Sequence, residues 1–515
     1  MARQRSNSMN TYINIVTSVG VMVVNLFISF WLSPYIIRTI GVEANGFVSL
    51  ANNFVTYANL IVTALNAMAA RFITIAYIQQ DYKKANLYYN SVFWGNLIIV
   101  AVLLFPATWL VVKLENIIDV PASILFDVKI LFSMVFVSFF VRTGFPNWDC
   151  GTTITNRLDL SYIPTMATAL LRCVLLVGMF TIWTPHVWYV SFTSTFIGFI
   201  TLGIAGYYTH KLTPELKVHF RKPICSWSAV KELVGSGIWS SIANGGNMLL
   251  SGLDLLICNI YIGATQMGIL SLSKTLPSIL IQLSESIRGA FGPELTISFA
   301  KGEKDKIYKT IRKAMKITSV VVTIPTAGLV VMSDAFYSLW VPTQNVKLLQ
   351  ILTTLAILSY LVNSGVVILF NVFSTVNKVK YNSWAMIVSG ICSFVITLLL
   401  IHFTDWDLYA VAGVSSIVTI CKNLFFTIPV ASRLLNYKWY CFYPQVGVSM
   451  LCSGIIILIG EIVRFFMPYS TWFTFFLTCG MIGVLGLGAN MMIVLNKEER
   501  SYLIGLFKRK ILHKG

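Results

Sequence analysis

Runs of about 20 apolar residues follow one another along almost the whole chain, separated only by short polar turns. Hydrophobic residues make up 56% of the 515 residues and charged residues only 11%, whereas soluble domains carry roughly 25% charged residues. Such a chain cannot cover a folded surface with polar side chains, so it needs lipid as its solvent. No stretch is long and polar enough to form a separate soluble domain. The sequence therefore predicts one membrane-embedded body of α-helices.

The apolar runs predict about 14 transmembrane helices, so the expected fold class is an all-α polytopic membrane protein. The first run continues past Trp31 without a cleavage site of small residues, so we expect a retained span and not a signal peptide. The predicted spans lie near residues 12–37, 47–77, 91–112, 128–152, 162–183, 187–208, 234–258, 266–298, 314–333, 348–373, 384–403, 408–431, 446–466 and 472–495.

Lysine and arginine are distributed very unevenly between the two sides of the predicted membrane. If both termini are cytoplasmic, 27 of the 38 Lys and Arg residues lie inside, five lie outside and six lie within spans. The positive-inside rule then predicts that both termini and the loop from His210 to Lys231 are cytoplasmic. The same asymmetry explains most of the net charge of +18, so the basic composition does not indicate a nucleic-acid partner.

Polar residues of catalytic or metal-binding type form no recognisable pattern. The nine cysteines and five histidines have neither ligand-like spacing nor a pair within one outer loop. The chain has no G-x-x-x-x-G-K-[ST] motif, and no Ser/His/Asp or Cys/His constellation stands out. We therefore expect no metal, no cofactor and no catalytic residue, and a protein that is not an enzyme.

An internal repeat organises the chain. Shifting the first third by 222 residues carries the first span onto the seventh, so the repeating unit is six spans long. An even number of spans preserves orientation, which predicts parallel repeats. The aligned residues include Ser18 with Ser240, Asn25 with Asn247, Gly41 with Gly263 and Gly46 with Gly268. The expected domains are a six-helix bundle over 1–212, a cytoplasmic linker over 213–233, a second six-helix bundle over 234–433, and two added helices with a basic tail over 434–515.

The second span carries a narrow polar stripe, because its polar residues recur at alternating steps of four and three positions from Asn45 to Asn66. Spans 1, 7 and 8 carry polar faces at equivalent places. An amide facing lipid without a partner is strongly unfavourable, so these faces must point inward. They fit the wall of a water-filled cavity, although polar stripes also serve as contacts between helices. The expected lining residues are Asn25, Asn52, Asn59, Asn66, Asn244 and Asn247.

Six cations lie within predicted spans, where each costs about 2.5–3.5 kcal/mol if it faces lipid. They must therefore line the cavity, pair with acids or reach a helix end. An excess of positive charge in a cavity favours an anionic substrate. The candidate cavity cations are Arg71, Arg142, Arg172, Lys274, Arg288 and Lys422.

The sequence suggests local partners for some of these cations. Arg142 lies seven residues from Asp149, and Arg288 lies three residues from Glu285, so either pair can be structural. Arg71 is nearest the cytoplasmic end of its span.

The remaining cations, Lys274, Arg172 and Lys422, have no acid close to them in sequence, so they are the strongest candidates for contact with an anion. The acids Asp254 and Glu285 lie on the polar faces of spans 7 and 8. We regard these two carboxylates as candidates for coupling transport to an ion gradient.

The first outer turn combines apolar residues, Arg38, Gly41, a short acidic and polar stretch, and Gly46-Phe47. This segment, from Tyr35 onward, resembles the polysaccharide flippases of the multidrug/oligosaccharidyl-lipid/polysaccharide exporter superfamily. The segments Asn66–Arg71 and Asn496–Arg500 are also similar to that family. The resemblance covers essentially the whole chain, and its motifs are more specific for the superfamily than for a substrate.

The resemblance implies two six-helix bundles arranged in a V around a central cavity, with alternating access. It also implies transfer of an undecaprenyl-diphosphate-linked oligosaccharide from the cytoplasmic to the outer leaflet of a bacterial plasma membrane. The implied partners are this lipid-linked oligosaccharide, membrane lipid, a coupling H⁺ or Na⁺, and other polysaccharide-assembly proteins. In the last span, glycines at 480, 483, 486 and 488 either admit the prenyl tail or pack against another helix.

Two other functions remain open at this point. A cation-coupled drug or metabolite exporter of the same superfamily would use Asp254 or Glu285 as its buried carboxylate. A membrane-embedded glycan polymerase or ligase would need an acidic site on an outer loop, where Glu115, Asp119 and Asp127 form the one cluster to consider. The short outer loops disfavour this enzyme class.

Overall fold

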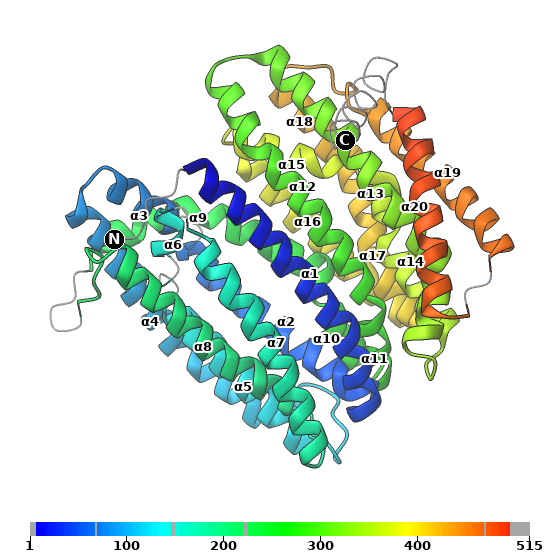
Figure 1. The fold of residues 1–515 in the computed structure, drawn as a ribbon, viewed down its shortest axis with the longest axis horizontal. Coiled ribbons are helices and arrows are strands. Elements are labelled where there is room, and N and C mark those ends of the chain that lie inside the picture. Colours follow the sequence, from blue (N-terminus) through cyan, green and yellow to red (C-terminus); the bar gives the residue numbers. More distant parts are fainter. Residues whose placement is uncertain are drawn as a thin grey trace, which may run out of the picture. The chain divides into compact units, whose positions relative to one another are not determined.

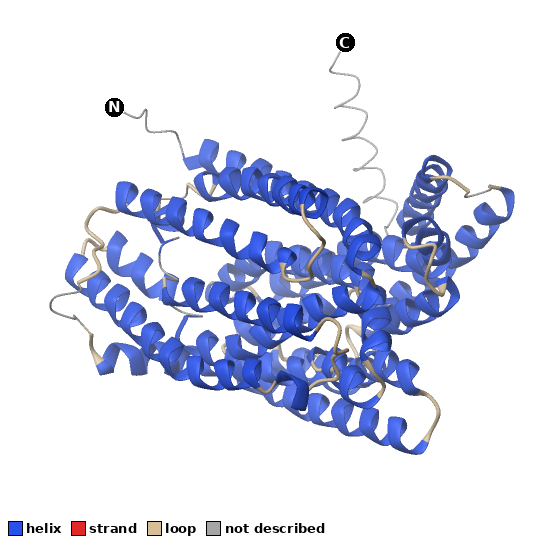
Figure 2. Cartoon of the chain, turned by 90° about the horizontal axis from the view of Figure 1, so that it is seen from below, coloured by secondary structure: helices blue, strands red, loops and turns tan. Residues whose placement is uncertain are grey.

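The computed structural model describes residues 7–66, 69–145, 148, 150–155, 157–219, 225–467 and 470–494. Within these ranges every regular element is a helix (Figures 1 and 2), which confirms the predicted all-α fold. Several residues of the sequence analysis lie outside the described ranges. These are the first six residues, Asp149, residues 220–224 of the loop from His210 to Lys231, and Asn496–Arg500 with the basic tail.

Two compact units account for the contacts within the chain. Unit 1 comprises Met1–Met248 and Leu255–Gly268, and unit 2 comprises Leu249–Asp254 and Ile269–Gly515. Helix α9 (Trp227–Asn247), which follows the predicted linker over 213–233, belongs to unit 1, where it packs along α2 (Val42–Asn66) and α4 (Tyr82–Val112).

Unit 1 contains long helices joined by short turns and a few short helical segments. Its helices are α1 (Asn7–Ile40), α2 (Val42–Asn66), α3 (Ala69–Ile78), α4 (Tyr82–Val112), η1 (Leu114–Asn116), α5 (Leu125–Gly144), α6 (Cys150–Ile154), α7 (Asp159–Ile182), α8 (Tyr189–Leu212) and α9 (Trp227–Asn247). Two short helices, α10 (Asp254–Tyr261) and α11 (Ala264–Ser273), have residues in both units.

Unit 2 begins with a π-helical turn and contains the remaining helices. They are η3 (Met248–Gly252), α12 (Thr275–Ala300), α13 (Lys304–Trp340), α14 (Val346–Asn363), η4 (Val366–Leu369), α15 (Phe370–Thr375), α16 (Val379–Phe403), α17 (Asp407–Lys422), η5 (Asn423–Thr427), α18 (Ile428–Leu434), α19 (Tyr443–Phe466) and α20 (Trp472–Val494). The core of this unit packs α13 against α14, α19 and α20.

The helices are those of a multi-pass membrane protein. Large apolar side chains such as Phe105, Phe425 and Phe465 are exposed along them, as a lipid solvent allows. Among the described residues, nine helices are long and apolar enough to span a membrane, or ten if the bent pair of α14 with η4 and α15 is one span. The count of 14 stays a prediction. The helices α9 and α12 of predicted spans 7 and 8 are 21 and 26 residues long but are not among these nine, and both spans are broken, at η3 and between α11 and α12.

The internal repeat is visible in the helix boundaries. Helices α2 and α11 begin at Val42 and Ala264, and helices α4 and α13 begin at Tyr82 and Lys304, so both pairs keep the 222-residue offset found in the sequence. Since helix starts depend on turn geometry and not on apolar composition, this agreement argues against chance similarity between apolar segments.

The turns before these helices repeat as well. Gly41 and Gly263 both have positive φ, at 88° and 134°, directly before α2 and α11. Gln80 and Gly302 have φ of 61° and 70° before α4 and α13. A left-handed residue that ends a helix favours glycine, which explains why three of these four positions are glycine.

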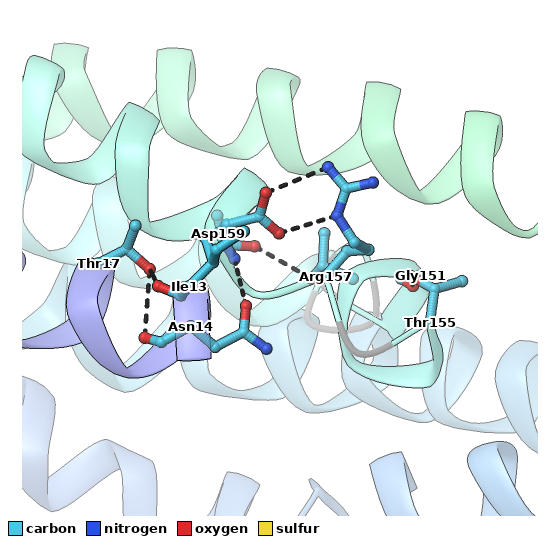
Figure 3. A network of polar contacts seen from close by, with 9 residues as sticks. Ile13, Asn14, Thr17, Gly151, Thr155, Arg157 and Asp159 are labelled. Carbon is cyan, nitrogen blue, oxygen red and sulfur yellow. Dashed lines mark hydrogen bonds and ion pairs between the residues drawn. The ribbon is translucent and has the colours of Figure 1, made fainter. Parts of the chain in front are cut away.

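A polar junction fixes the start of α1 against the start of α7 in unit 1 (Figure 3). The side-chain oxygen of Asn14 accepts a hydrogen bond of 2.9 Å from the backbone N–H of Asp159. The Asp159 carboxylate in turn receives two hydrogen bonds from Arg157, at 2.9 and 3.1 Å. This bidentate contact raises the pKa of the Arg157 guanidinium, so the cation at this helix junction stays charged.

Candidate functional site

A cavity of about 620 Å³ lies within unit 1, between α2, α5, α7 and α8, which are labelled in Figure 1. Both polar and apolar side chains line its wall. The lining residues are Val48, Asn52, Val55, Asn59, Val62, Thr63, Asn66, Val135, Ser138, Phe139, Arg142, Thr143, Arg172, Val190, Ser191, Ser194 and Thr195. The volume falls within the range of ligand pockets, about 300–1,000 Å³.

The polar stripe predicted on the second span forms one wall of this cavity. Asn52, Asn59 and Asn66 all line it, because steps of seven residues bring side chains back to nearly the same face of a helix. The Asn52 side chain is exposed and donates to the Val48 carbonyl at 2.8 Å. The amide of Asn59 makes no hydrogen bond to a described residue, so it is available to a ligand.

The two arginines predicted on spans 4 and 5 meet at the same cavity. Arg142 comes from the last turn of α5, and its side chain is exposed. Arg172 comes from the middle of α7, and its Nε is buried without a hydrogen-bond partner among the described residues. Neither arginine forms an ion pair with a described residue.

Among the described residues that line the cavity, none is an aspartate or a glutamate. Two guanidinium groups therefore face it without a carboxylate to neutralise them there. Arginine presents a planar fork of donors that matches phosphate and carboxylate groups, so this arrangement can bind an anion in two-point contacts.

Hydroxyl groups on α5 and α8 also line the cavity, and the sequence analysis did not identify them. Ser138 precedes Arg142 by one helical turn, and Ser191, Ser194 and Thr195 share one face of α8. Ser194 donates to the Val190 carbonyl at 2.7 Å, and Thr195 donates across to the Met134 carbonyl at 3.0 Å. Such local bonds let serine and threonine occur in any apolar helix, so the sequence carried little signal for them.

Lys274 has no acid close to it in sequence, but the fold brings one to it. Its ammonium forms an ion pair with Asp254 in unit 2, and Asp254 is almost completely buried. The two residues are 20 positions apart and meet because the chain turns back between α10 and α11. Glu285 and Arg288 form the predicted ion pair within one turn of α12.

Lys422 lies in unit 2 and does not line the described cavity. Its side chain is buried, with Nζ 3.1 Å from the Met386 sulfur and 5.0 Å from the centre of the Phe370 ring. No described carboxylate forms an ion pair with it. The ammonium of Lys422 thus contacts a polarisable sulfur and the face of an aromatic ring, and not the wall of a polar pocket.

The other predicted lining residues are not part of this cavity. Arg71 on α3, Asn25 on α1, and Asn244 and Asn247 on α9 are exposed. Three of the four glycines of α20, at 480, 483 and 488, have open space where a side chain would begin, whereas Gly486 lies against Ile456. Within the described residues, no group of three or more His, Cys, Asp or Glu could hold a metal ion.

Comparison with known proteins gives one curated relative and several solved structures. No family model matches the chain. The chain is 25% identical over 501 residues to the uncharacterized membrane protein EpsK of Bacillus subtilis, which covers 96% of this chain and 98% of that protein.

Three of the solved structures to which the chain is similar are a flippase and two transporters. The lipid II flippase MurJ in an inward closed conformation has a TM-score of 0.66 at 12% identity, covering 97% of this chain and 100% of that one. An inward-facing multidrug resistance MATE family transporter of the MOP superfamily has a TM-score of 0.63 at 11% identity, covering 79% and 95%. The eukaryotic MATE transporter AtDTX14 has a TM-score of 0.56 at 14% identity, covering 86% and 95%. The chain therefore has the fold shared by the lipid II flippase MurJ and the MATE transporters.

Proposed function

We propose that this protein is a flippase that moves an undecaprenyl-diphosphate-linked oligosaccharide from the cytoplasmic to the outer leaflet by alternating access. The observation that carries the proposal is the cavity of unit 1, where Arg142 and Arg172 face the interior and no carboxylate of the described part of the chain lines the wall. A substrate with a diphosphate brings the negative charge that such a wall requires. The shared fold with a lipid II flippase supports the same class of substrate.

The cavity chemistry suits both parts of the substrate head. The guanidinium groups of Arg142 and Arg172 bind the diphosphate oxygens through charge-assisted hydrogen bonds. Sugar hydroxyls pair with the amides of Asn52 and Asn59 and with the hydroxyl of Ser191, which can each donate and accept. The prenyl chain stays in the apolar phase, where the open side of α20 offers it a surface.

A cation-coupled drug exporter is the second candidate, and the structure of unit 2 disfavours it. Such an exporter needs a carboxylate that exchanges a small cation for an organic one. Both candidate carboxylates, Asp254 and Glu285, already have a lysine or arginine partner. An organic cation would also meet the like charges of Arg142 and Arg172 in the cavity.

The proposal includes a location and an energy source. We place the protein in the bacterial plasma membrane with both termini in the cytoplasm, in accordance with the positive-inside rule. Transport draws on an ion gradient, and the assembled glycan is passed to other polysaccharide-assembly proteins on the outer side.

Flipping in proteoliposomes tests the function directly. The substrate is an undecaprenyl-diphosphate-linked oligosaccharide loaded into the inner leaflet, and its appearance outside is measured by lectin capture. We expect capture with the wild-type protein and a loss of at least about tenfold with Arg172→Gln. Arg71→Gln, on an exposed cation outside the cavity, is the matched control and should retain flipping. Export of ethidium without any flipping of the lipid-linked sugar would instead establish the drug exporter.

A further inference from the structure

Two helix breaks meet in unit 2 and are joined by an ion pair. The first break follows α9, where the π-helical turn η3 ends at Gly252 and Asp254 begins α10. The second break separates α11 from α12, and Lys274 is the residue between them. The side chains of Asp254 and Lys274 connect the two breaks.

The π-helical turn leaves backbone carbonyls that a regular helix would satisfy. Side chains from elsewhere in unit 2 take these carbonyls. The Ser393 hydroxyl of α16 donates to the Leu250 carbonyl at 3.0 Å, and Lys274 Nζ donates to the Ser251 carbonyl at 3.3 Å. The break is therefore closed by specific partners and is not a loosely packed bend.

The ammonium of Lys274 thus sits among oxygen atoms of two kinds. One is the carboxylate of Asp254, a residue that is 6% exposed, and the other is the carbonyl of Ser251 beside it. Transporters bind small cations with backbone carbonyls of broken membrane helices, and here the Asp254 carboxylate lies beside such a carbonyl. These hard oxygen ligands suit Na⁺ better than any soft metal.

The buried carboxylate of Asp254 needs a positive charge beside it. A buried carboxylate without a partner is strongly unfavourable, and breaking such a pair by removing one partner is costly. In this protein the charge is supplied by a side chain of the same chain. The Lys274 side chain is 28% exposed, so solvent can reach the pair if the lysine is removed.

We propose that Asp254 and the Ser251 carbonyl form a site for a monovalent cation, and that the ammonium of Lys274 occupies this site in place of a free ion. The site therefore takes no Na⁺ from solution in the wild-type protein, and Asp254 is not a sodium-coupling residue. Removing the lysine side chain converts the same oxygen atoms into a sodium site. This inference concerns cation binding alone and does not depend on the transported substrate.

A purely structural ion pair makes a different prediction. If Lys274 and Asp254 only hold two helix breaks together, removing the lysine destabilises the protein equally in every salt. If the oxygen atoms form a cation site, the lost stability returns with Na⁺ in a saturable manner, because a ligand that binds only the folded state stabilises it.

The test is thermal unfolding of the purified full-length protein in detergent, in NaCl against choline chloride at equal ionic strength. We expect the Tm of the wild-type protein to be the same in both salts. We expect the Tm of Lys274→Ala to be lower in choline chloride and to rise with NaCl, by on the order of 2 °C at 100 times the dissociation constant. The double variant Asp254→Asn/Lys274→Ala removes the anionic ligand and is the matched control, with no response to Na⁺.

Two further variants test whether the response to Na⁺ depends on the charge of the side chain at position 274. Lys274→Arg retains a positive charge and should remain insensitive to Na⁺, whereas Lys274→Ser should respond as Lys274→Ala does. A sodium-dependent Tm in the wild-type protein would overturn the proposal. The proposal would also be overturned if the Lys274→Ala and Lys274→Ser proteins fold and their Tm does not change with Na⁺, Li⁺ or K⁺. If both variants fail to fold in NaCl as well as in choline chloride, sodium does not replace the ammonium and the proposal is wrong.

Discussion

Asn66 of α2 and Asn96 of α4 exchange two amide hydrogen bonds, at 3.0 and 2.9 Å, directly behind the wall of the unit 1 cavity. Asn96 is completely buried, whereas Asn66 lines the cavity. Each amide satisfies the other, so the last residue of the polar stripe is held in place by a partner from a different helix. Asn66 therefore shapes the cavity and is less available to a ligand than Asn59.

Replacing Asn96 with alanine should destabilise unit 1. The substitution leaves the Asn66 amide without its buried partner, which costs about 1–3 kcal/mol of unfolding free energy. Unfolding in SDS, followed by circular dichroism, measures the change. The double variant Asn66→Ala/Asn96→Ala should cost less than the sum of the single variants, with a coupling of about 0.6–1.7 kcal/mol. Additive costs would mean that the amide pair does not stabilise the fold.

Asn59→Ala is the control variant, because it removes an amide without a described partner. It should change the free energy of unfolding by less than about 0.5 kcal/mol.

Two asparagines of α4 bind the extended segment that follows α8. Asn86 donates to the Glu215 carbonyl and accepts from the Lys217 N–H, at 2.7 and 2.9 Å. Asn90 repeats this pattern one turn later, with the Lys217 carbonyl and the His219 N–H, both at 2.8 Å. The two asparagine side chains thus pair with the backbone of this segment, as the backbone of a neighbouring strand would.

Asn90→Ala should release this segment from α4. The amide hydrogen of His219 loses its acceptor, so its exchange with deuterium should become faster by about fivefold for each 1 kcal/mol of lost stabilisation. Hydrogen exchange with mass spectrometry of the peptide around 213–219 provides the measurement. Asn90→Asp keeps an acceptor for His219 and should preserve more of its protection than the alanine variant. Equal exchange in the wild-type and alanine proteins would show that the asparagine contacts do not hold the segment.

Gly237 and Gly235 of α9 make a matched pair for testing how closely α9 packs on α2. A side chain added at Gly237 would collide with the Ala64 carbonyl, whereas nothing lies within 4 Å of one added at Gly235. Gly237→Ala should therefore destabilise the protein by about 1–3 kcal/mol, as overpacking does. Gly235→Ala should stabilise it by about 0.5–1 kcal/mol, because alanine favours a helix. Thermal unfolding of both variants decides, and a tolerated Gly237→Ala would contradict the close approach of the two helices.

The sequence predicted those parts of the site that depend on periodicity within one helix. Asn52, Asn59 and Asn66 could be assigned to one wall because a polar side chain every seven residues has no other good place in an apolar helix. The internal repeat predicted that the second and eighth spans correspond, and the helix starts at Val42 and Ala264 keep its offset of 222 residues. These features need no knowledge of which helices are neighbours.

The parts that the sequence analysis missed depend on contacts between helices. Lys274 and Asp254 meet across two helix breaks, and a pattern of continuous spans gives no reason to place such breaks. Lys422 looked like a cavity cation, but a phenylalanine ring and a methionine sulfur, neither of which is a polar signal, surround its charge. Arg142 and Arg172 were both identified, but only the packing of α5 and α7 shows that they share one cavity.

The central claim is that Arg142 and Arg172 form a diphosphate-binding cavity in unit 1. Farnesyl diphosphate is a suitable probe, because it carries the diphosphate and a short prenyl chain without sugars. Isothermal titration of the purified protein in detergent gives its dissociation constant. Farnesol, which lacks the charge, is the control ligand, and Arg71→Gln is the control variant.

We expect Arg142→Gln and Arg172→Gln each to weaken farnesyl diphosphate binding by about 10- to 150-fold, since each removes a charge-assisted contact worth about 1.5–3 kcal/mol. Arg71→Gln should bind as the wild-type protein does, and farnesol should bind weakly to all variants. If the double variant Arg142→Gln/Arg172→Gln binds farnesyl diphosphate as tightly as the wild-type protein, the cavity does not recognise the diphosphate and the account is wrong.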